Sequence, residues 1–211
     1  ILDCSCGSGF AILELIKRRY DITCSDGSQD MLHLFEQRAN AMGLPVKPEL
    51  IQWADLASSF ANSFDVVMCR GSSLIYASSW DRNSVDNLEE IVVALQNFYS
   101  CLKPGGVLYV DTTSAKDLEA TNPIVETYPE KTINGQMVSV VEEVSTNRDA
   151  DTRIWKVSVS VDGEEYQLER NSCHLSHEQL IAMLQEVGFT NIQKIDIEGE
   201  RYAVFTANTP E

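Results

Sequence analysis

The chain has 211 residues, of which 44% are hydrophobic and 23% charged, so it is long enough to bury the core of one α/β domain. It carries 16 basic and 32 acidic residues, and the resulting net charge of -16 argues against nucleic acid or an anionic membrane as a partner. The sequence contains no run of about 18 apolar residues, so no membrane-spanning helix is expected.

The cysteines and histidines lack the spacing of a metal site. The six cysteines contain no C-x-x-C pair, and three of them fall on expected buried strands. This pattern favours reduced thiols packed inside a cytoplasmic protein over disulfides or zinc ligands. The three scattered histidines have no metal-ligand spacing either, so no metal is expected.

The first expected element is a buried strand followed by a tight turn of small residues. Residues 1–9 read Ile-Leu-Asp-Cys-Ser-Cys-Gly-Ser-Gly, and a helix is expected over 10–19. Gly7 and Gly9 allow unusual backbone torsions and close approach of a ligand. A second apolar run over 20–25 leads to Asp26, about 20 residues after the loop, where an acid can bind the ribose hydroxyls of an adenosine cofactor.

The same loop argues against nucleotide phosphates as its ligand. The dinucleotide pattern G-x-G-x-x-G fails because Ile12 stands at the third glycine position, and no Gly-Lys-Ser/Thr of a P-loop is present. Asp3, just before the loop, would repel a pyrophosphate but would attract a cationic amino-acid group. The residues therefore favour an adenosine cofactor with a cationic part.

The following elements alternate between helix and strand up to residue 112. An apolar stripe predicts a helix from Ser28 that stops at Gly43. A second stripe predicts a helix over about 84–102, which the turn 103–106 ends before a short apolar strand at 107–110. This alternation predicts a parallel sheet with helices on both faces.

Residues 125–174 show the two-residue period of antiparallel strands. Asn134-Gly135 and Asp162-Gly163 are hairpin turn signals, so three or four strands with one solvated face are expected. A capping box at Ser176 opens a helix that closes at Gly188, and a last hairpin over 190–198 and 201–207 turns at Gly199.

These elements predict a single α/β domain with a Rossmann-like doubly wound sheet, mostly parallel, with an antiparallel last strand and an inserted antiparallel β-subdomain. We expect a cofactor-binding core at 1–112, an inserted β-extension on the substrate side at 113–175, and a C-terminal helix and hairpin at 176–211 that complete the core.

Five segments resemble, in the same order, the motifs of class I S-adenosylmethionine-dependent methyltransferases. They are residues 1–9, where Ser5 replaces the usual first glycine, and residues 25–32, 53–56, 64–69 and 102–106. Segments 69–74 and 173–175 resemble the glycine/sarcosine N-methyltransferase group. The resemblance implies an enzyme of EC class 2.1.1 that uses S-adenosyl-L-methionine, releases S-adenosyl-L-homocysteine and methylates a small molecule.

The resemblance also implies roles for particular residues. Asp26 would bind the ribose hydroxyls, Asp55 the adenine amino group through its side chain, and Leu56 the adenine through its backbone, while the glycines make room for the methionine part. The expected cofactor-binding residues are Asp3, Cys4, Gly7, Gly9, Asp26, Gly27, Met31, Asp55, Leu56, Cys69 and Ser73.

On the acceptor side, Arg70, Tyr76 and His174 are the catalytic candidates. The related enzymes hold the substrate carboxylate with an arginine of D-x-R-N-Y-D, but Thr113 stands at that position, so Arg70 or Lys116 is expected to take this part. Three aromatic residues are candidates for a cage around a methylammonium, namely Tyr76, Trp80 and Tyr128.

Three functions remain open from the sequence. The first is methylation of a small amine, with glycine or sarcosine on a betaine-type route as examples. The second is O- or N-methylation of another small metabolite. The third is a non-catalytic module that binds the cofactor. The sequence leaves the acceptor and the oligomeric state, monomer or homo-oligomer, undetermined.

Overall fold

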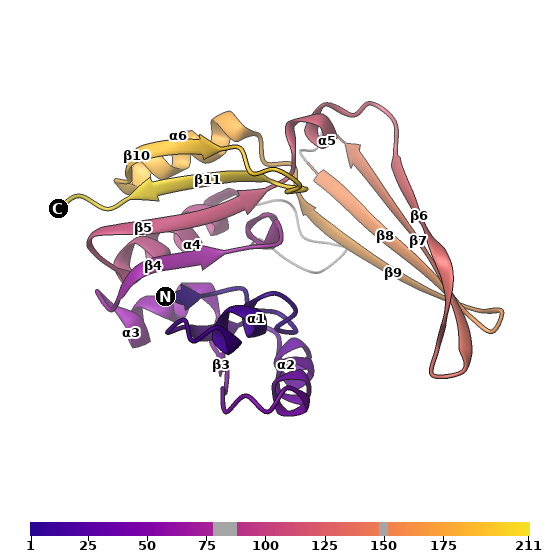
Figure 1. Cartoon of the computed structure of the whole chain (residues 1–211). Helices are drawn as coiled ribbons and strands as arrows, with labels where there is room; N and C mark the ends of the chain where they lie inside the picture. Colours follow the sequence, from indigo (N-terminus) through magenta and orange to yellow (C-terminus); the bar gives the residue numbers. More distant parts are fainter. Residues whose placement is uncertain (78–87, 148–151) are drawn as a thin grey trace.

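The computed structural model describes residues 1–77, 88–147 and 152–211, which form two β-sheets and the helices around them (Figure 1). The main sheet has seven strands in the order β10-β11-β5-β4-β1-β2-β3, and the second has four in the order β6-β7-β8-β9. The predicted fold class is therefore confirmed.

The main sheet is parallel except at its last strand in the chain, which runs antiparallel to both of its neighbours. The parallel strands are β1 (Leu2–Asp3), β2 (Thr23–Asp26), β3 (Glu49–Leu50), β4 (Phe64–Cys69) and β5 (Leu102–Thr112). The strand β11 (Ala203–Asn208) pairs antiparallel with both β5 and β10 (Thr190–Ile195). The carboxyl ends of β1, β2, β4 and β5 consequently lie along one edge, which is where open α/β sheets bind ligands.

The helices begin and end where side chains and glycines satisfy the backbone. The Ser28 hydroxyl accepts the Met31 N–H at the start of α2 (Gln29–Ala41). The predicted capping box at Ser176 is present at the start of α6 (His177–Val187), and Gly188 ends that helix with a φ of 107°. The helix predicted from residue 84 is described from Leu88 to Cys101 as α4, and its expected start lies outside the described residues. The remaining helical segments are α1 (Ile12–Lys17), α3 (Leu56–Phe60), α5 (Ala115–Glu119) and the 3₁₀ turns η1 (Trp53–Asp55) and η2 (Ser73–Tyr76).

Two apolar clusters hold these elements together. In the larger one, α4 and α6 pack against β1, β4, β5 and β11, and Figure 1 shows both helices behind the sheet. The smaller cluster joins α1 and α2 to β2 around the fully buried Phe35. Burial of this apolar surface is what stabilises the cofactor-side core.

The boundaries differ from the sequence prediction in two places. The helix α1 covers only 12–17 of the expected 10–19. The expected turn at 103–106 is instead a bulged start of β5, where the register with β4 shifts between Phe64 and Val66. Gly105 has a φ of 72° there, and its N–H donates to the Pro210 carbonyl. The C-terminal segment therefore pairs with residues that sequence reasoning treated as a free turn.

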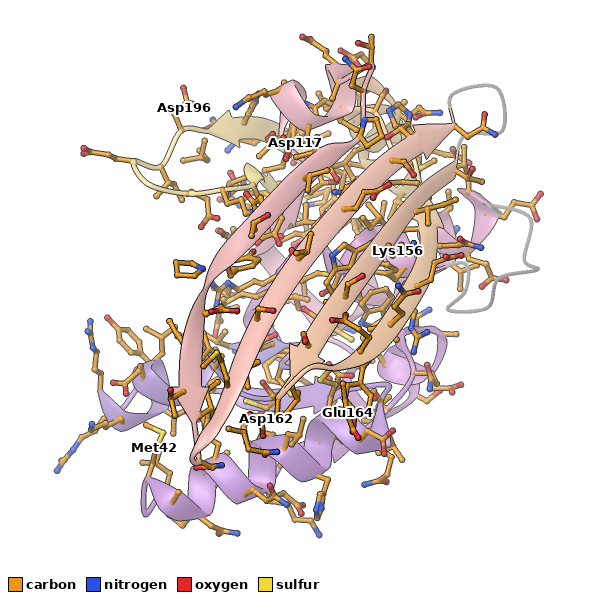
Figure 2. All side chains as sticks on the ribbon, turned by 90° about the vertical axis from the view of Figure 1, so that its right-hand side faces the viewer. Met42, Asp117, Lys156, Asp162, Glu164 and Asp196 are labelled. Carbon is orange, nitrogen blue, oxygen red and sulfur yellow. The ribbon has the colours of Figure 1, made fainter. Side chains whose placement is uncertain are left out.

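The inserted sheet contains four long strands joined as predicted. They are β6 (Ile124–Ile133), β7 (Gln136–Asn147), β8 (Thr152–Val161) and β9 (Glu164–Cys173). Both residues of each predicted turn, Asn134-Gly135 and Asp162-Gly163, have positive φ, as a type I′ hairpin requires. Figure 1 shows the sheet projecting from the main domain, and in Figure 2 its outer face, which carries Lys156, is toward the viewer.

Among the described residues no helix is long and apolar enough to cross a membrane. All six cysteines are buried, and none of them forms a disulfide.

Candidate functional site

A cleft of about 790 Å³ lies between the carboxyl edge of the main sheet and the inserted sheet. On the sheet side it is lined by residues that end or follow β1, β2, β4 and β5, among them Cys4, Asp26, Gly71 and Thr113. On the other side it is lined from β7, β8 and β9 and from Arg201 and Tyr202. Its volume lies within the roughly 300–1,000 Å³ typical of pockets for small organic ligands.

Asp26 connects the glycine loop to the end of β2. Its Oδ2 accepts the Gly7 N–H at 2.8 Å, and its Oδ1 accepts the Ser28 N–H at 2.9 Å. Burial raises the pKa of this carboxyl, an effect that the same two hydrogen bonds oppose. Each carboxylate oxygen can accept a second hydrogen bond. Asp26 lines the cleft, so it can accept hydrogen bonds from the loop and from a ligand at the same time.

The two glycines of the loop have different surroundings. Both have positive φ, 52° at Gly7 and 77° at Gly9. A Cβ on Gly7 would meet no atom within 4 Å, and Gly7 lines the cleft. A Cβ on Gly9 would come within 2.8 Å of Phe35 and 2.9 Å of Leu13. Gly7 therefore leaves space for a ligand, whereas the space at Gly9 is filled by the core of α1 and α2.

We expect alanine substitutions at these two glycines to have separable effects. Both variants carry left-handed strain of about 1–2 kcal/mol, and Gly9→Ala adds overpacking of about 1–3 kcal/mol against Phe35 and Leu13. Gly9→Ala should lower the free energy of unfolding more, and Gly7→Ala should lower the affinity for S-adenosylmethionine more. Urea unfolding and calorimetry measure the two quantities. Equal effects of both variants on both quantities would contradict this assignment.

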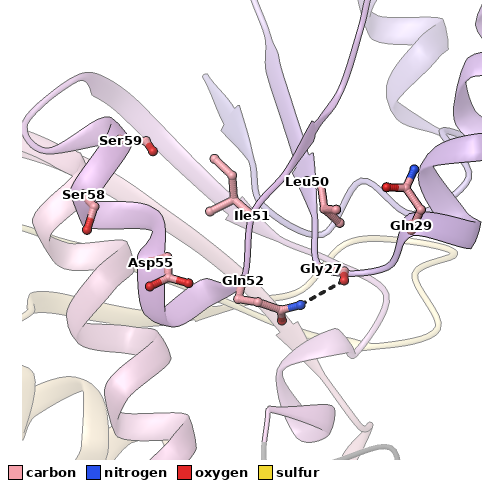
Figure 3. Close-up of a pocket in the computed structure, with 8 residues that line it drawn as sticks. All are labelled: Gly27, Gln29, Leu50, Ile51, Gln52, Asp55, Ser58 and Ser59. Atoms are coloured by element: carbon pink, nitrogen blue, oxygen red, sulfur yellow. Dashed lines mark hydrogen bonds between the residues drawn. The ribbon is translucent and has the colours of Figure 1, made fainter.

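The structure places the expected adenine-binding residues differently from the sequence prediction. Asp55 lies at the end of η1 and lines a neighbouring pocket of about 450 Å³ together with Gly27 and Gln52 (Figure 3). The Leu56 N–H donates to the Trp53 carbonyl, and the backbone contact of Leu56 to adenine stays a prediction. Gln52 lines both pockets and donates from Nε2 to the Gly27 carbonyl at 3.0 Å. Gln52 and Trp53, rather than Asp55 and Leu56, face the main cleft.

Asp3, Cys4 and Cys69 form the layer beneath the glycine loop. Of these residues only Cys4 is among those that line the cleft, and its carbonyl accepts the Trp53 indole N–H at 2.6 Å. Cys69 is fully buried at the end of β4. Asp3 is 2% exposed, and its carboxylate accepts the Ser5 N–H at 3.1 Å. Burial raises the pKa of Asp3 to about 6, against an ordinary value of 3.8.

The raised pKa of Asp3 predicts a pH-dependent stability. The folded protein binds this proton more tightly than the unfolded chain does, so the contribution of Asp3 to stability falls as pH rises from about 4 to about 6. The fall amounts to at most about 3 kcal/mol, since one pKa unit is about 1.4 kcal/mol. In Asp3→Asn this loss should be absent, so urea unfolding from pH 4 to 7 should show the variant gaining stability relative to the unsubstituted chain. A constant difference across this range would contradict the prediction.

The loop after β4 is held by the buried Asp111. The Gly71 N–H donates to Asp111 Oδ2 at 3.1 Å, and the Ser72 N–H donates to Asp111 Oδ1. Ser72 adopts a left-handed conformation with a φ of 53°. The Ser73 hydroxyl, on a residue that lines the cleft, donates to the Arg70 carbonyl. These bonds fix the loop that faces the acceptor half of the cleft.

The acceptor candidates are only partly brought together. Tyr76 lines the cleft, and burial raises its pKa. Arg70 is not among the described lining residues, and its charge instead affects the pKa values of Tyr109 and Asp111. His174 contacts the Leu118 carbonyl at 3.4 Å outside the lining.

The proposed aromatic cage is also not assembled by the described residues. Tyr128 does not line the cleft, and its hydroxyl donates to Glu126. Lys116, which was a candidate for the substrate carboxylate and not for the cage, does not line the cleft either. Trp80 lies outside the described residues. Met31 and Gly27, in contrast, both line the cleft as expected.

Sequence reasoning missed the charged residues that the insert brings to the cleft. They are Glu142, Arg153 and Arg170, joined by Arg201 and Tyr202 from the last hairpin. The period of two that places Arg153 on the same face as Trp155 was visible in the sequence. The pairing of Trp155 with Arg170 across β8 and β9 could not be predicted from the sequence.

Comparisons with known proteins agree with this geometry. A family model described as "Methyltransferase domain" matches residues 1–106, half of the chain. A glycine/sarcosine N-methyltransferase of Halorhodospira halochloris is 28% identical over 111 residues, which are 53% of this chain and 38% of the relative. The matched part is thus well under half of that relative's own length.

Solved structures match over the whole chain. An S-adenosylmethionine-dependent methyltransferase from Clostridium acetobutylicum has a TM-score of 0.77 at 19% identity and covers 100% of this chain and 83% of its own. The amino pentose methyltransferase CalS10 from Micromonospora echinaspora, solved with S-adenosylmethionine bound, has a TM-score of 0.74 at 18% identity and covers 98% of this chain and 81% of its own.

The fold, the cleft at the carboxyl edge of the sheet and the family match lead to one conclusion. The chain belongs to the methyltransferase-domain family.

Proposed function

We propose that this chain transfers the methyl group of S-adenosylmethionine to the nitrogen of a small-molecule amine, with glycine and sarcosine as the first acceptors to test. The observation that carries the proposal is the continuity of the cleft. One cavity extends from Gly7 and Asp26, on the donor side, to Glu142 and Arg153 of the insert. A donor and a small acceptor can therefore lie in the same cleft.

The residues on the sheet side suit S-adenosylmethionine. Gly7 leaves room beside the loop backbone, and Asp26 has acceptor capacity for two ribose hydroxyls. Gln52 and Met31 offer an amide and a thioether to the adenine. When bound, S-adenosylmethionine supplies a methyl group that is already activated on a sulfonium, so this chain has to orient the acceptor and exclude water.

The residues on the insert side suit an amine. Glu142 and Asp117 place carboxylates in the cleft, where they can attract an ammonium group as it approaches. Tyr76 and Tyr202, whose pKa values burial raises, stay neutral and can accept or donate a hydrogen bond. No strong base is required if the amine arrives deprotonated.

The alternative is an O- or N-methyltransferase of another metabolite. Glycine, sarcosine, dimethylglycine, amino sugars and phenols, each with S-adenosylmethionine, form a panel that separates these functions, and release of S-adenosylhomocysteine is the readout. We expect turnover with at least one primary or secondary amine and none with phenols. Turnover with phenols alone would reject the amine proposal, and cofactor binding without any turnover would favour a non-catalytic module.

A further inference from the structure

The cleft-facing side of the inserted sheet is divided into two halves. Near the main domain it carries Glu142, Arg153, Trp155 and Arg170, all of which line the cleft. Farther along β8 the same face continues with Val157, Val159 and Val161, because successive side chains alternate between the two faces of a strand. On β8, therefore, Arg153 and Trp155 occupy the half that faces the cofactor cleft, and valines occupy the rest of this face.

Arg153 is a partly buried cation without a partner among the described residues. Its Nε is buried and has no hydrogen-bond partner, and no described carboxylate lies within ion-pair distance of its guanidinium. Arg201, by comparison, pairs with Glu126 at 3.2 Å. The chain has twice as many acidic as basic residues, 32 against 16, so a shortage of carboxylates does not explain why no described residue pairs with Arg153. An unpaired buried guanidinium costs stability unless a ligand satisfies it.

The surroundings of Arg153 belong to the acceptor half of the cleft. Burial lowers the pKa of Arg153, and Tyr76, Asp117 and Tyr202 are close enough to oppose this shift. These residues come from η2, α5 and the last hairpin, not from the glycine loop or α2. The donor-side residues Gly7 and Asp26 lie on the sheet side of the cleft.

We propose that Arg153 binds an anionic group of the methyl acceptor, a carboxylate or a phosphate, and thereby selects amines that carry such a group; this inference rests on the proposed function. The Nη–H groups of the guanidinium lie in one plane, as a fork, and match two oxygens of either group, whereas Nε is buried. An anion on this fork supplies the partner that the described residues do not provide. The amine of such an acceptor then lies toward Glu142 and the methyl donor.

Calorimetry on the chain saturated with S-adenosylhomocysteine tests the proposal. The probes form matched pairs with and without the anion, namely sarcosine against dimethylamine and phosphoethanolamine against ethanolamine. We expect one anionic member to bind at least about tenfold more tightly than its neutral partner, since a hydrogen bond to a charged group contributes about that factor or more. Which pair shows the preference separates a carboxylate from a phosphate.

Three variants assign the preference to this side chain. Arg153→Gln should abolish it and Arg153→Lys should retain part of it, because lysine keeps the charge but loses the fork. Lys156→Gln is the matched control, since it removes one positive charge from the outer face of the same strand (Figure 2). The affinity for S-adenosylhomocysteine should be unchanged in all three, and if Arg153→Gln fails to fold, Arg153→Lys carries the test.

Three results would overturn the proposal. The first is equal binding of anionic and neutral probes, and the second is no binding of any probe to the cofactor-saturated chain. The third is a loss of S-adenosylmethionine affinity in Arg153→Gln and Arg153→Lys. That loss would show that the guanidinium binds the carboxylate of the methyl donor. Failure of the proposed function is a separate result, because it shows as absent amine turnover in chains that still bind an anionic probe.

Discussion

Replacing Asp26 by Ala is expected to weaken binding of S-adenosylmethionine by about 1–3 kcal/mol, or roughly 5- to 150-fold, because hydrogen bonds to a charged group contribute on that order. The carboxylate lines the cleft while it accepts the N–H groups of Gly7 and Ser28. The substitution therefore removes a ribose partner and also releases the loop. The fold should survive, since Asp26 is at the end of β2 and is only partly buried.

Calorimetry with S-adenosylmethionine and S-adenosylhomocysteine measures this loss. Asp26→Asn keeps the shape and one acceptor oxygen, so it should bind with intermediate affinity. Asp196→Ala, which removes an exposed carboxylate from the turn between β10 and β11, is the control for net charge (Figure 2). Wild-type affinity in Asp26→Ala would show that the ribose assignment is wrong.

Replacing Asp111 by Ala is expected to lower the free energy of unfolding by about 2–5 kcal/mol, because each buried group left without a partner costs about 1–3 kcal/mol. Two backbone donors, Gly71 N–H and Ser72 N–H, would lose their acceptor inside the protein. Asp111 is 2% exposed, and Ser72, one of the two donors, is buried as well. Urea unfolding measures the loss.

The same variant should also slow methyl transfer, because the loop that Asp111 holds lines the cleft through Gly71, Ser72 and Ser73. Asp111→Asn retains one acceptor oxygen and should lose about half as much stability. If Asp111→Ala unfolds like the unsubstituted chain, the two hydrogen bonds do not hold the loop.

The sequence alone was sufficient for the fold class and for the local conformation of several turns and helix ends. Local rules operate there: glycines allow positive φ at residues 7 and 9, Ser176 and Gly188 delimit α6, and Asn-Gly and Asp-Gly specify the hairpins. These signals depend on a few neighbouring residues, so they can be read without knowing the rest of the chain.

The bounds of two strands, β5 and β3, depend on pairing with residues that are distant in sequence. The segment 103–106 reads as a free turn, but the carbonyls of Lys103 and Gly106 accept hydrogen bonds from Thr209, and this pairing extends β5. The strand β3 has only two residues and no periodic pattern of its own, and it forms because it pairs with the end of β2. Long-range pairing of this kind overrides local propensity.

The acceptor half of the cleft was decided only by tertiary structure. Sequence reasoning chose Arg70 because it follows β4, but the fold turns its side chain toward Tyr109 and Asp111 and brings Arg153, Arg170 and Arg201 to the cleft instead. The position of these arginines depends on the register of β7, β8 and β9 and on how the insert closes over the sheet. The sequence predicts the face of the strand on which a residue lies. Which element packs against that face is set by tertiary structure. Gly7 and Arg153, for example, line the same cleft although they are more than 100 residues apart in the chain.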